Sequence, residues 1–441
     1  MPNVLLDYVL GSQAKRPFVR KTWVDRNTTK RAYRIKALDS PGYYKSSSQA
    51  VLFGDSFQPF YGIHTGTQHI TLRGSPINLS IATGYNVTAN PLLGSTDGMV
   101  WSAKNLPGGQ TYSAIGIFNS QLWVYSRSAL YVSTDLNGTS WSTSVNSPTG
   151  SGNLRPIVFG TRIVTSPGAE STAIYSNTTA SSFSTHTLPV SMMVTGMATD
   201  GTTLIIVGHG SSGAGYVYKT TDLTNFTLVS VKLSSTDAEL SGVTTVNGVA
   251  LSASTAIFTP LGVTYNGSTF VIIAIDTMLL GGAINDYTVS AYRVYTGSSA
   301  GPFLAKSEIR TDFNNAQYTT KNYFANMYKC QQKTGQFITS DSSGRVAVGL
   351  AVSALGYVDA NAYWTTSPCI AYSDDNGETW TLSEISTRPT VNGFTGDLLY
   401  MCTHIYPSPN GFVVFYGNYG ANSPDFCMIT NANAREMAMP Y

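Results

Sequence analysis

The sequence predicts an all-β protein made of repeated antiparallel sheets. Three observations support this fold class: a low content of charge, strand-length apolar segments joined by tight-turn residues, and one turn motif that recurs along the chain. Charged residues make up 11% of the 441 residues and hydrophobic residues make up 42%, which suits a folded core and not a charge-rich disordered chain. No apolar run reaches the roughly 18 residues of a membrane span. We therefore expect a soluble protein without a membrane span.

From about residue 85 onward, strand-length segments flank tight turns. Four hairpins are predicted, at residues 115–124, 197–206, 263–272 and 405–414. Three of them contain Asn-Gly or Asp-Gly, the pairs that supply the positive φ angles of a two-residue hairpin turn. A segment at about 68–84, which contains His69 to Leu72, is expected to pair with the last hairpin, because such closure removes exposed strand edges.

A second, shorter motif follows several of these hairpins. Residues 373–380 read Ser-Asp-Asp-Asn-Gly-Glu-Thr-Trp and match the pattern S-x-D-x-G-x-T-W in full. The Asp carboxylate can accept backbone N–H groups across a turn, Ser or Thr adds a second local bond, and Gly takes a left-handed conformation. The aromatic residue that follows is large enough to pack between neighbouring sheets. The full and looser copies comprise Ser373, Asp375, Gly377, Thr379 and Trp380; Ser133, Asp135, Gly138 and Trp141; Ser95, Asp97, Gly98 and Trp101; and Thr220, Asp222 and Phe226.

The spacing of these turns predicts the architecture. With two weak copies at 176–183 and 296–303, the closing aromatic residues stand at 101, 141, 183, 226, 303 and 380. The first three steps are 40, 42 and 43 residues, about the length of a four-stranded blade of a β-propeller. Each of the last two steps is 77 residues and hides either a lost turn or an insertion, expected at 227–260 and 312–360. We predict a β-propeller of six or seven blades over residues 61–441, with seven favoured; a pair of β-sandwiches and a β-helix are the alternatives.

The turn motif resembles the Asp-box, or BNR repeat, of the sialidase-like propellers. In that family an arginine triad binds the substrate carboxylate, a Tyr–Glu pair supplies the nucleophile and an Asp acts as acid or base. This chain departs from that set, because Arg34-Ile35-Lys36 only partly resembles the family's Arg-Ile-Pro motif and Glu378 lies inside the complete turn motif. The later arginines, Arg155, Arg293 and Arg345, stand in no recognisable motif. No catalytic residue is therefore carried over from the family.

The sequence also gives no sign of a metal or cofactor. The five His residues form no HExxH motif, and the four Cys residues lack the spacing of a metal site or a disulfide framework. We predict that the chain binds no metal and no cofactor. The 27 Tyr residues, together with Asn, Ser and Thr, are suited to contacts with glycans or protein surfaces, although most are expected within strands.

Charge is distributed unevenly along the chain. Residues 1–45 hold ten Lys and Arg against three Asp, whereas the remainder holds 16 basic and 21 acidic residues. Dense positive charge interleaved with aromatic residues is typical of an arm that docks to an acidic surface; a solvated tail is the alternative and a nucleic-acid contact the least favoured. We predict that residues 1–60 form an extended attachment arm. Its docking residues are Lys15, Arg16, Arg20, Lys21, Trp23, Arg26, Lys30, Arg31 and Arg34.

The layout as a whole resembles a structural protein of a bacteriophage tail. The N-terminus lacks a basic segment followed by an apolar one, so we expect no Sec-type secretion and release by lysis of the host in whose cytoplasm the chain is made. By that resemblance, the chain is a virion tail protein that docks to other tail proteins through its arm, and forms tail wall or presents loops to a host surface or glycan. We expect a homo-oligomer. The alternatives are a sialidase-like glycoside hydrolase with a diverged active site and an intracellular protein-interaction propeller, with an enzyme disfavoured.

Overall fold

The structure is a computed structural model of the chain. It describes residues 22–24, 31–35, 51–53, 60–73, 77–81, 85–89, 92–96, 102–104, 106, 112–126, 129–143, 156–210, 214–243, 245–246, 249–250, 258–275, 291–310, 338–358, 361–385, 400–409, 411–418 and 425–431. All regular elements among these residues are β-strands. Within these ranges, no segment forms a helix that could span a membrane. The prediction of an all-β fold is confirmed.

The repeating unit is an antiparallel meander of four strands, in which each strand pairs with the next one of its sheet. The meanders consist of β4 (Phe60–His64), β5 (His69–Arg73), β8 (Leu92–Ser95) and β9 (Ser102–Ala103); β10 (Tyr112–Phe118), β11 (Gln121–Ser126), β12 (Leu130–Ser133) and β13 (Trp141–Thr143); β14 (Ile157–Phe159), β15 (Arg162–Thr165), β16 (Ser171–Asn177) and the first half of β17 (Ser184–Thr199); the second half of β17, β18 (Leu204–His209), β19 (Gly215–Thr220) and β20 (Thr227–Leu228); β24 (Thr259–Tyr265), β25 (Phe270–Ile275), β26 (Ala291–Gly297) and β27 (Phe303–Arg310); and β28 (Ile338–Ser340), β29 (Val346–Val358), β30 (Asn361–Ser373) and β31 (Thr381–Ile385).

The last sheet combines both ends of the chain. Its strands β32 (Tyr400–Ser408), β33 (Gly411–Asn418) and β34 (Asp425–Asn431) are followed by β3 (Val51–Phe53), which pairs antiparallel with β34. Strands β6 (Ile77–Ile81) and β7 (Tyr85–Ala89) extend the sheet beyond β3.

The prediction of the strand that closes the ring was partly wrong. His69 to Leu72 lie in β5 of the first meander and pair with β4 and β8, so the expectation that they pair with the last hairpin is wrong. The strand that pairs with β34 is β3. Short strands of similar composition cannot be assigned to partners by pattern alone, because the pairing joins residues far apart in the chain.

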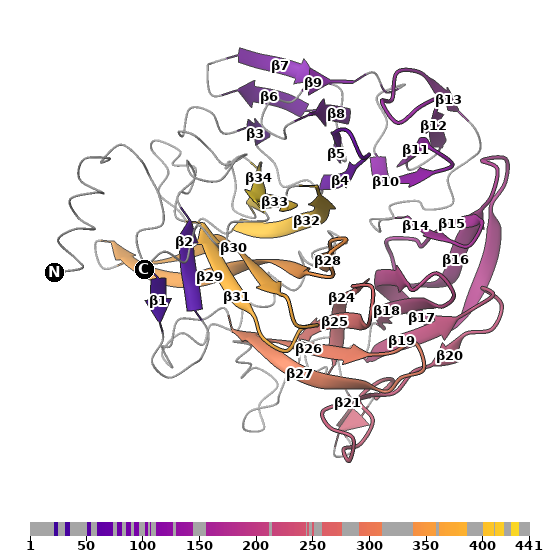
Figure 1. The fold of residues 1–441 in the computed structure, drawn as a ribbon, viewed down its shortest axis with the longest axis vertical. Helices are drawn as coiled ribbons and strands as arrows, with labels where there is room; N and C mark the ends of the chain where they lie inside the picture. The colour runs from indigo at the N-terminus through magenta and orange to yellow at the C-terminus, as the bar shows by residue number, and fades with distance from the viewer. Residues whose placement is uncertain are drawn as a thin grey trace.

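Contacts between the first strands of the sheets close them into a ring. The contacts run from β4 to β10, β14, β17, β24, β28 and β32, and from β32 back to β4. In Figure 1 the sheets follow one another around a common centre in chain order, and the yellow β32–β34 lie beside the indigo β4 and β5. Meanders arranged around a centre in this way form a β-propeller-like fold.

Small residues let the first strands approach one another closely. A Cβ atom on Gly196 of β17 would lie 2.8 Å from the backbone nitrogen of Val263 and 2.9 Å from the Cα of Gly262, both on β24. A Cβ atom on Gly262 would in turn lie 2.8 Å from Cγ2 of Ile338 on β28. Any larger residue at these two positions would push neighbouring sheets apart.

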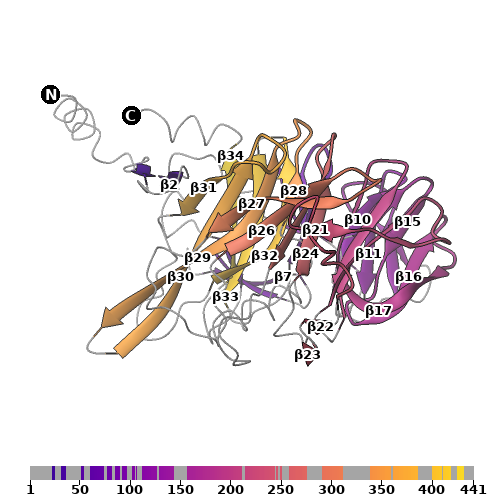
Figure 2. The ribbon, with the colours of Figure 1, turned by 90° about the horizontal axis from the view of Figure 1, so that it is seen from below.

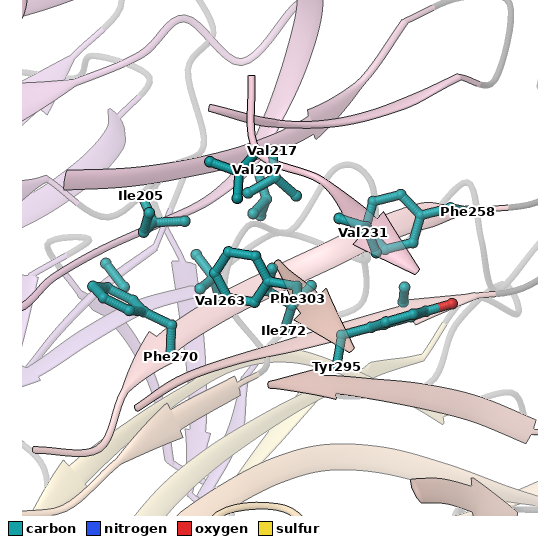
Figure 3. Close-up of a cluster of buried hydrophobic side chains, with 13 residues drawn as sticks. Ile205, Val207, Val217, Val231, Phe258, Val263, Phe270, Ile272, Tyr295 and Phe303 are labelled. Carbon is teal, nitrogen blue, oxygen red and sulfur yellow. The ribbon is translucent and has the colours of Figure 1, made fainter. Parts of the chain in front are cut away.

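The apolar core lies between the sheets. Figure 3 shows Ile205, Val207 and Val217 of one sheet against Val263 and Ile272 of the next, all of them buried. Full burial of such a side chain contributes about 1.5–3 kcal/mol relative to its exposure to water. Stacking of consecutive sheets therefore provides the main stabilisation of the ring.

The four predicted hairpins are confirmed by the strand register. The end residues of each predicted segment face one another, as in the pairs Ile115 with Val124, Met197 with Ile206, Val263 with Ile272, and Ile405 with Val414. The turn residues Asn119, Gly201, Gly267 and Gly411 have positive φ angles, as the sequence predicts.

The predicted insertions were located only in part. Between β20 and β24, the chain forms β21 (Val231–Lys232), which pairs in parallel with β27, and a small hairpin of β22 (Thr245–Val246) and β23 (Val249–Ala250). Residues 338–358, expected to belong to an insertion, instead form β28 and β29 of a regular meander. Strands β29 and β30 are long, and Figure 2 shows their hairpin reaching beyond the other sheets.

Three described strands fall within residues 1–60. Strand β1 (Thr22–Val24) pairs with β2 (Arg31–Ile35), and β2 pairs in parallel with β31, which extends that sheet outward. The third is β3, in the last sheet. The division into an arm at 1–60 and a propeller at 61–441 stays a prediction.

Candidate functional site

The six predicted turns all connect the third strand of a meander to the fourth. They are 95–101 between β8 and β9, 133–141 between β12 and β13, 176–183 between β16 and β17, 220–226 between β19 and β20, 296–303 between β26 and β27, and 373–380 between β30 and β31. In a meander this connection leaves the sheet at the same end as the connection between the first two strands. We call this end of the ring the turn face.

The turn at 373–380 satisfies its own polar groups. The Asp375 carboxylate accepts hydrogen bonds from the backbone N–H of Thr379 at 2.8 Å, from the Thr379 hydroxyl, and from the Ser373 hydroxyl at 2.8 Å. The Ser373 oxygen accepts the Gly377 N–H at 2.7 Å, and the indole of Trp380 donates to the Gly377 carbonyl at 3.2 Å. Burial raises the pKa of Asp375, but the hydrogen bonds from Thr379 and Ser373 outweigh it and hold the pKa below its ordinary value.

The turn at 133–141 repeats this construction with one extra residue. The Asp135 carboxylate accepts the Thr139 hydroxyl at 2.8 Å and the Thr139 N–H at 3.2 Å, and the Trp141 indole donates to the Gly138 carbonyl at 3.2 Å. The Thr139 hydroxyl is the main reason that the pKa of Asp135 lies below its ordinary value. The Ser133 oxygen accepts the backbone N–H of Leu122 on β11, so it also ties the turn to its own sheet.

The turn at 220–226 retains the Asp of the motif but lacks its Gly and Trp. Asp222 accepts the N–H groups of Thr224 and Asn225, each at 2.8 Å, and the Asn225 N–H lowers its pKa most. Leu223 takes the left-handed conformation, with φ of 62°, and its side chain is only 1% exposed. Leu223 lies in an apolar cluster against which Phe226 also packs. The sequence did not single out Leu223, although an apolar residue within a polar turn was a usable signal.

The turn at 95–101 is described only at its beginning. Ser95 is buried at the end of β8, whereas Asp97, Gly98 and Trp101 lie outside the described residues.

Hydrogen bonds on the turn face link neighbouring sheets. The amide of Gln68, in the first turn of one meander, donates to the Asn137 side chain at 2.7 Å in the motif turn of the next. The amide of Asn266 donates to the Asn376 side chain at 2.6 Å in the same relation between two other sheets. The motif pattern alone does not predict these bonds, although Asn137 and Asn376 both precede the Gly of their motif and this shared position was a signal.

The turn at 296–303 carries the Gly-x-Ser-x-Gly letters of a nucleophile elbow, although no such elbow is expected from the sequence. Residues 297–301 read Gly-Ser-Ser-Ala-Gly. A nucleophile elbow joins a strand to a helix, whereas these residues join β26 to β27. Ser299 forms a hydrogen bond with Asp200, in the first turn of the preceding sheet. The Ser299 side chain therefore helps to link two neighbouring sheets.

Two of the arginines considered for a sialidase triad form ion pairs. Arg293 of β26 pairs with Glu308 of β27 at 3.1 Å, and Arg345 pairs with Asp374 of the turn face at 2.6 Å. Arg155 lies outside the described residues. Within the described ranges, no group of three or more His, Cys, Asp or Glu could hold a metal ion.

The structure describes little of the predicted docking residues. Trp23 lies in β1, and Arg31 and Arg34 lie in β2. The remaining docking residues fall outside the described residues; they are Lys15, Arg16, Arg20, Lys21, Arg26 and Lys30.

Comparison with known proteins gives no family for the chain. No protein-family model matches it, and no curated protein matches it. Among solved structures, it is similar to virginiamycin B lyase from Staphylococcus aureus, with 10% sequence identity and a TM-score of 0.48 over 86% of this chain and 97% of that chain. It is also similar to the N-terminal domain of Nup159, with 12% identity and a TM-score of 0.39 over 90% of this chain and 99% of that chain. These values are too low to transfer an activity or a partner.

Proposed function

We propose that the chain is a seven-bladed Asp-box propeller that serves as a non-catalytic structural component of a bacteriophage tail. In this proposal the basic N-terminal segment attaches the ring to neighbouring tail proteins, and the ring forms tail wall or presents its loops to a host surface or glycan. The subunits are expected to form a homo-oligomer.

The count of seven rests on the closed series of contacts around the ring. One meander begins at each of β4, β10, β14, the second half of β17, β24, β28 and β32. Each of the two 77-residue steps in the motif spacing spans a single meander, so the series needs no lost turn. The seventh sheet takes its fourth strand, β3, from the N-terminal part of the chain.

The Asp-box assignment is supported by the chemistry of two turns. In both 133–141 and 373–380, the carboxylate accepts the N–H and the hydroxyl of one Thr, and the Trp indole donates to the Gly carbonyl. Both turns connect third to fourth strands. This repeated self-satisfied turn favours a role in folding over one in catalysis.

The attachment role rests on one observation, the position of the basic segment in the sheet order. Strands β1 and β2 add to the outer side of β31, so the described parts of this segment form the outermost strands of one sheet. The outermost strand of a sheet presents backbone groups that another chain can pair with, and dense positive charge around it favours an acidic partner. The sheet order thus supports docking at the rim of the ring.

The alternative glycoside hydrolase has weaker support. Such an enzyme needs three arginines around one substrate carboxylate. Arg293 and Arg345 are instead engaged by Glu308 and Asp374, on two different sheets. The other alternative is an intracellular protein-interaction propeller. Unlike the tail proposal, it requires no assembly of the chain into a phage particle.

Incorporation into phage particles tests the proposal. The genes beside the coding sequence give the first check, since portal, capsid or terminase genes are expected there. Deletion of residues 1–45 should abolish incorporation into particles, while circular dichroism and thermal melting still report a folded β-protein. Normal incorporation of the truncated chain would refute the attachment role.

A charge-reversal pair separates docking from loss of strands. The deletion also removes β1 and β2, so the double variant Arg20→Glu with Lys21→Glu keeps both strands and reverses charge beside them. It should reduce incorporation strongly. The matched control, Lys219→Glu with Lys232→Glu, changes the same net charge on the ring and should leave incorporation unchanged.

A further inference from the structure

The ring closes where β32 of the last sheet lies against β4 of the first, and histidine and tyrosine form this joint. The Nε2 atom of His404 lies 3.0 Å from the carbonyl oxygen of Gly62, and the Tyr406 hydroxyl lies 3.3 Å from Nδ1 of His69. A Cβ atom on Gly62 would lie 2.2 Å from Cε1 of Tyr406, so the absence of a side chain there makes room for the tyrosine ring. We call Gly62, His64, His69, His404 and Tyr406 the seam.

One other joint between first strands uses residues that do not titrate near neutral pH. Where β17 meets β24, the Thr195 hydroxyl donates to the Pro260 carbonyl at 2.8 Å. Gly196 and Gly262 each follow the register shift of their strand, and His404 follows the corresponding shift of β32. The last sheet therefore carries a histidine at the strand position where two other sheets carry glycine.

Two histidines of the seam lie next to one another. The rings of His64 and His69 are 4.7 Å apart between centroids, and Nδ1 of His64 accepts the backbone N–H of Gly66 at 3.0 Å. Burial holds the pKa of His64 below its ordinary value of 6.5. A proton on Nδ1 of His64 would remove the acceptor of the Gly66 N–H and would place a charge beside His69.

The strands around the seam offer little negative charge. Strands β4, β5, β8, β10, β28, β29, β30 and β32 contain no Asp or Glu. The motif turn that Gln68 contacts carries Asp135, whose carboxylate already accepts the groups of Thr139. Besides the seam histidines and Tyr406, the titratable or charged residues of the strands that contact β4 or β5 are Tyr61, Arg73, Tyr112, Tyr400 and Cys402.

We propose that the seam is an acid-sensitive closure of the ring, in which protonation of the His64–His69 pair loosens the contact between the first and last sheets. A histidine whose folded pKa is lowered stabilises the fold in its neutral form, so its contribution is complete above about pH 6.5 and declines as the pH falls below that value. The first and last sheets separate under mild acid before the remaining joints do. This inference does not depend on the proposed tail function.

Hydrogen exchange of the intact protein at pH 7.5 and pH 5.5 tests the closure. After correction for the intrinsic effect of pH on exchange, peptides that cover β4 and β32 should lose protection several-fold at pH 5.5. Peptides that cover β24 and β25, which contain no histidine, should keep their protection. Equal loss in all first strands, or no loss at the seam, would overturn the proposal.

A histidine variant identifies the group that responds. The His64→Gln variant removes one of the two neighbouring charges and should reduce the acid-induced loss at the seam. The control His186→Gln alters a histidine whose Nε2 lies 2.8 Å from the Ser176 hydroxyl on another sheet, and it should leave the response of the seam unchanged. A His64→Gln protein with the full wild-type response would overturn the role of the pair. Exchange of the wild-type protein decides the proposal even where a variant fails to fold.

Discussion

Two neighbouring aspartates in one turn should differ sharply in their contribution to stability. Asp375 accepts hydrogen bonds from the Thr379 N–H, the Thr379 hydroxyl and the Ser373 hydroxyl. Asp374 instead pairs with Arg345 at 2.6 Å, with both side chains partly exposed. The substitutions Asp375→Ala and Asp374→Ala therefore remove two different kinds of interaction at adjacent positions.

The expected magnitudes follow from these contacts. A hydrogen bond to a charged group contributes about 1.5–3 kcal/mol. Because Thr379 is exposed, water can replace part of the hydrogen bonding that its N–H and hydroxyl lose in the variant. We expect Asp375→Ala to lower the free energy of unfolding by about 2 kcal/mol. An ion pair between partly exposed side chains contributes about 0–1 kcal/mol. Asp374→Ala should therefore lower the free energy of unfolding by less than about 1 kcal/mol.

Urea unfolding of the wild type and both variants measures this difference. The midpoints should shift with little change in the slope, because neither substitution alters the surface exposed on unfolding. Equal losses for the two variants would refute the reasoning that the motif Asp stabilises the turn through its backbone and hydroxyl donors. So would a loss for Asp375→Ala smaller than that for Asp374→Ala.

Three further outcomes are expected. Because the folded pKa of Asp375 is lowered, its contribution should be complete above about pH 4 and disappear as the pH falls through that folded pKa, so acid titration of urea midpoints should bring wild type and Asp375→Ala together. Gly196→Ala places a Cβ against backbone atoms of the next sheet and should lower the free energy of unfolding by about 1–3 kcal/mol; no loss would contradict the close approach of first strands. Leu223→Ala should cost about 2–5 kcal/mol in urea unfolding, whereas Leu228→Ala, at an exposed side chain, should cost less than about 0.5 kcal/mol; similar costs would contradict burial of the turn residue.

The local turns follow from the residues that form them. The hairpins at 115–124, 197–206, 263–272 and 405–414 have the predicted register, and the segment at 373–380 forms the predicted self-satisfied turn. These features involve residues at most nine positions apart, so the φ preferences of Asn and Gly and the reach of an Asp side chain are sufficient to specify them. The same reasoning anticipated the left-handed glycine of the turn.

The way the sheets meet depends on contacts between residues far apart in the chain. The pairing of β3 with β34, the sharing of β17 between two sheets and the contact of His404 with Gly62 all join residues whose sequence neighbours give no sign of the partner. Many short strands with similar apolar patterns could pair with one another equally well on local grounds. The strands that pair in the structure are those that let complete sheets pack against one another around the ring. This packing joins residues far apart in the chain, so no short stretch of sequence reveals it.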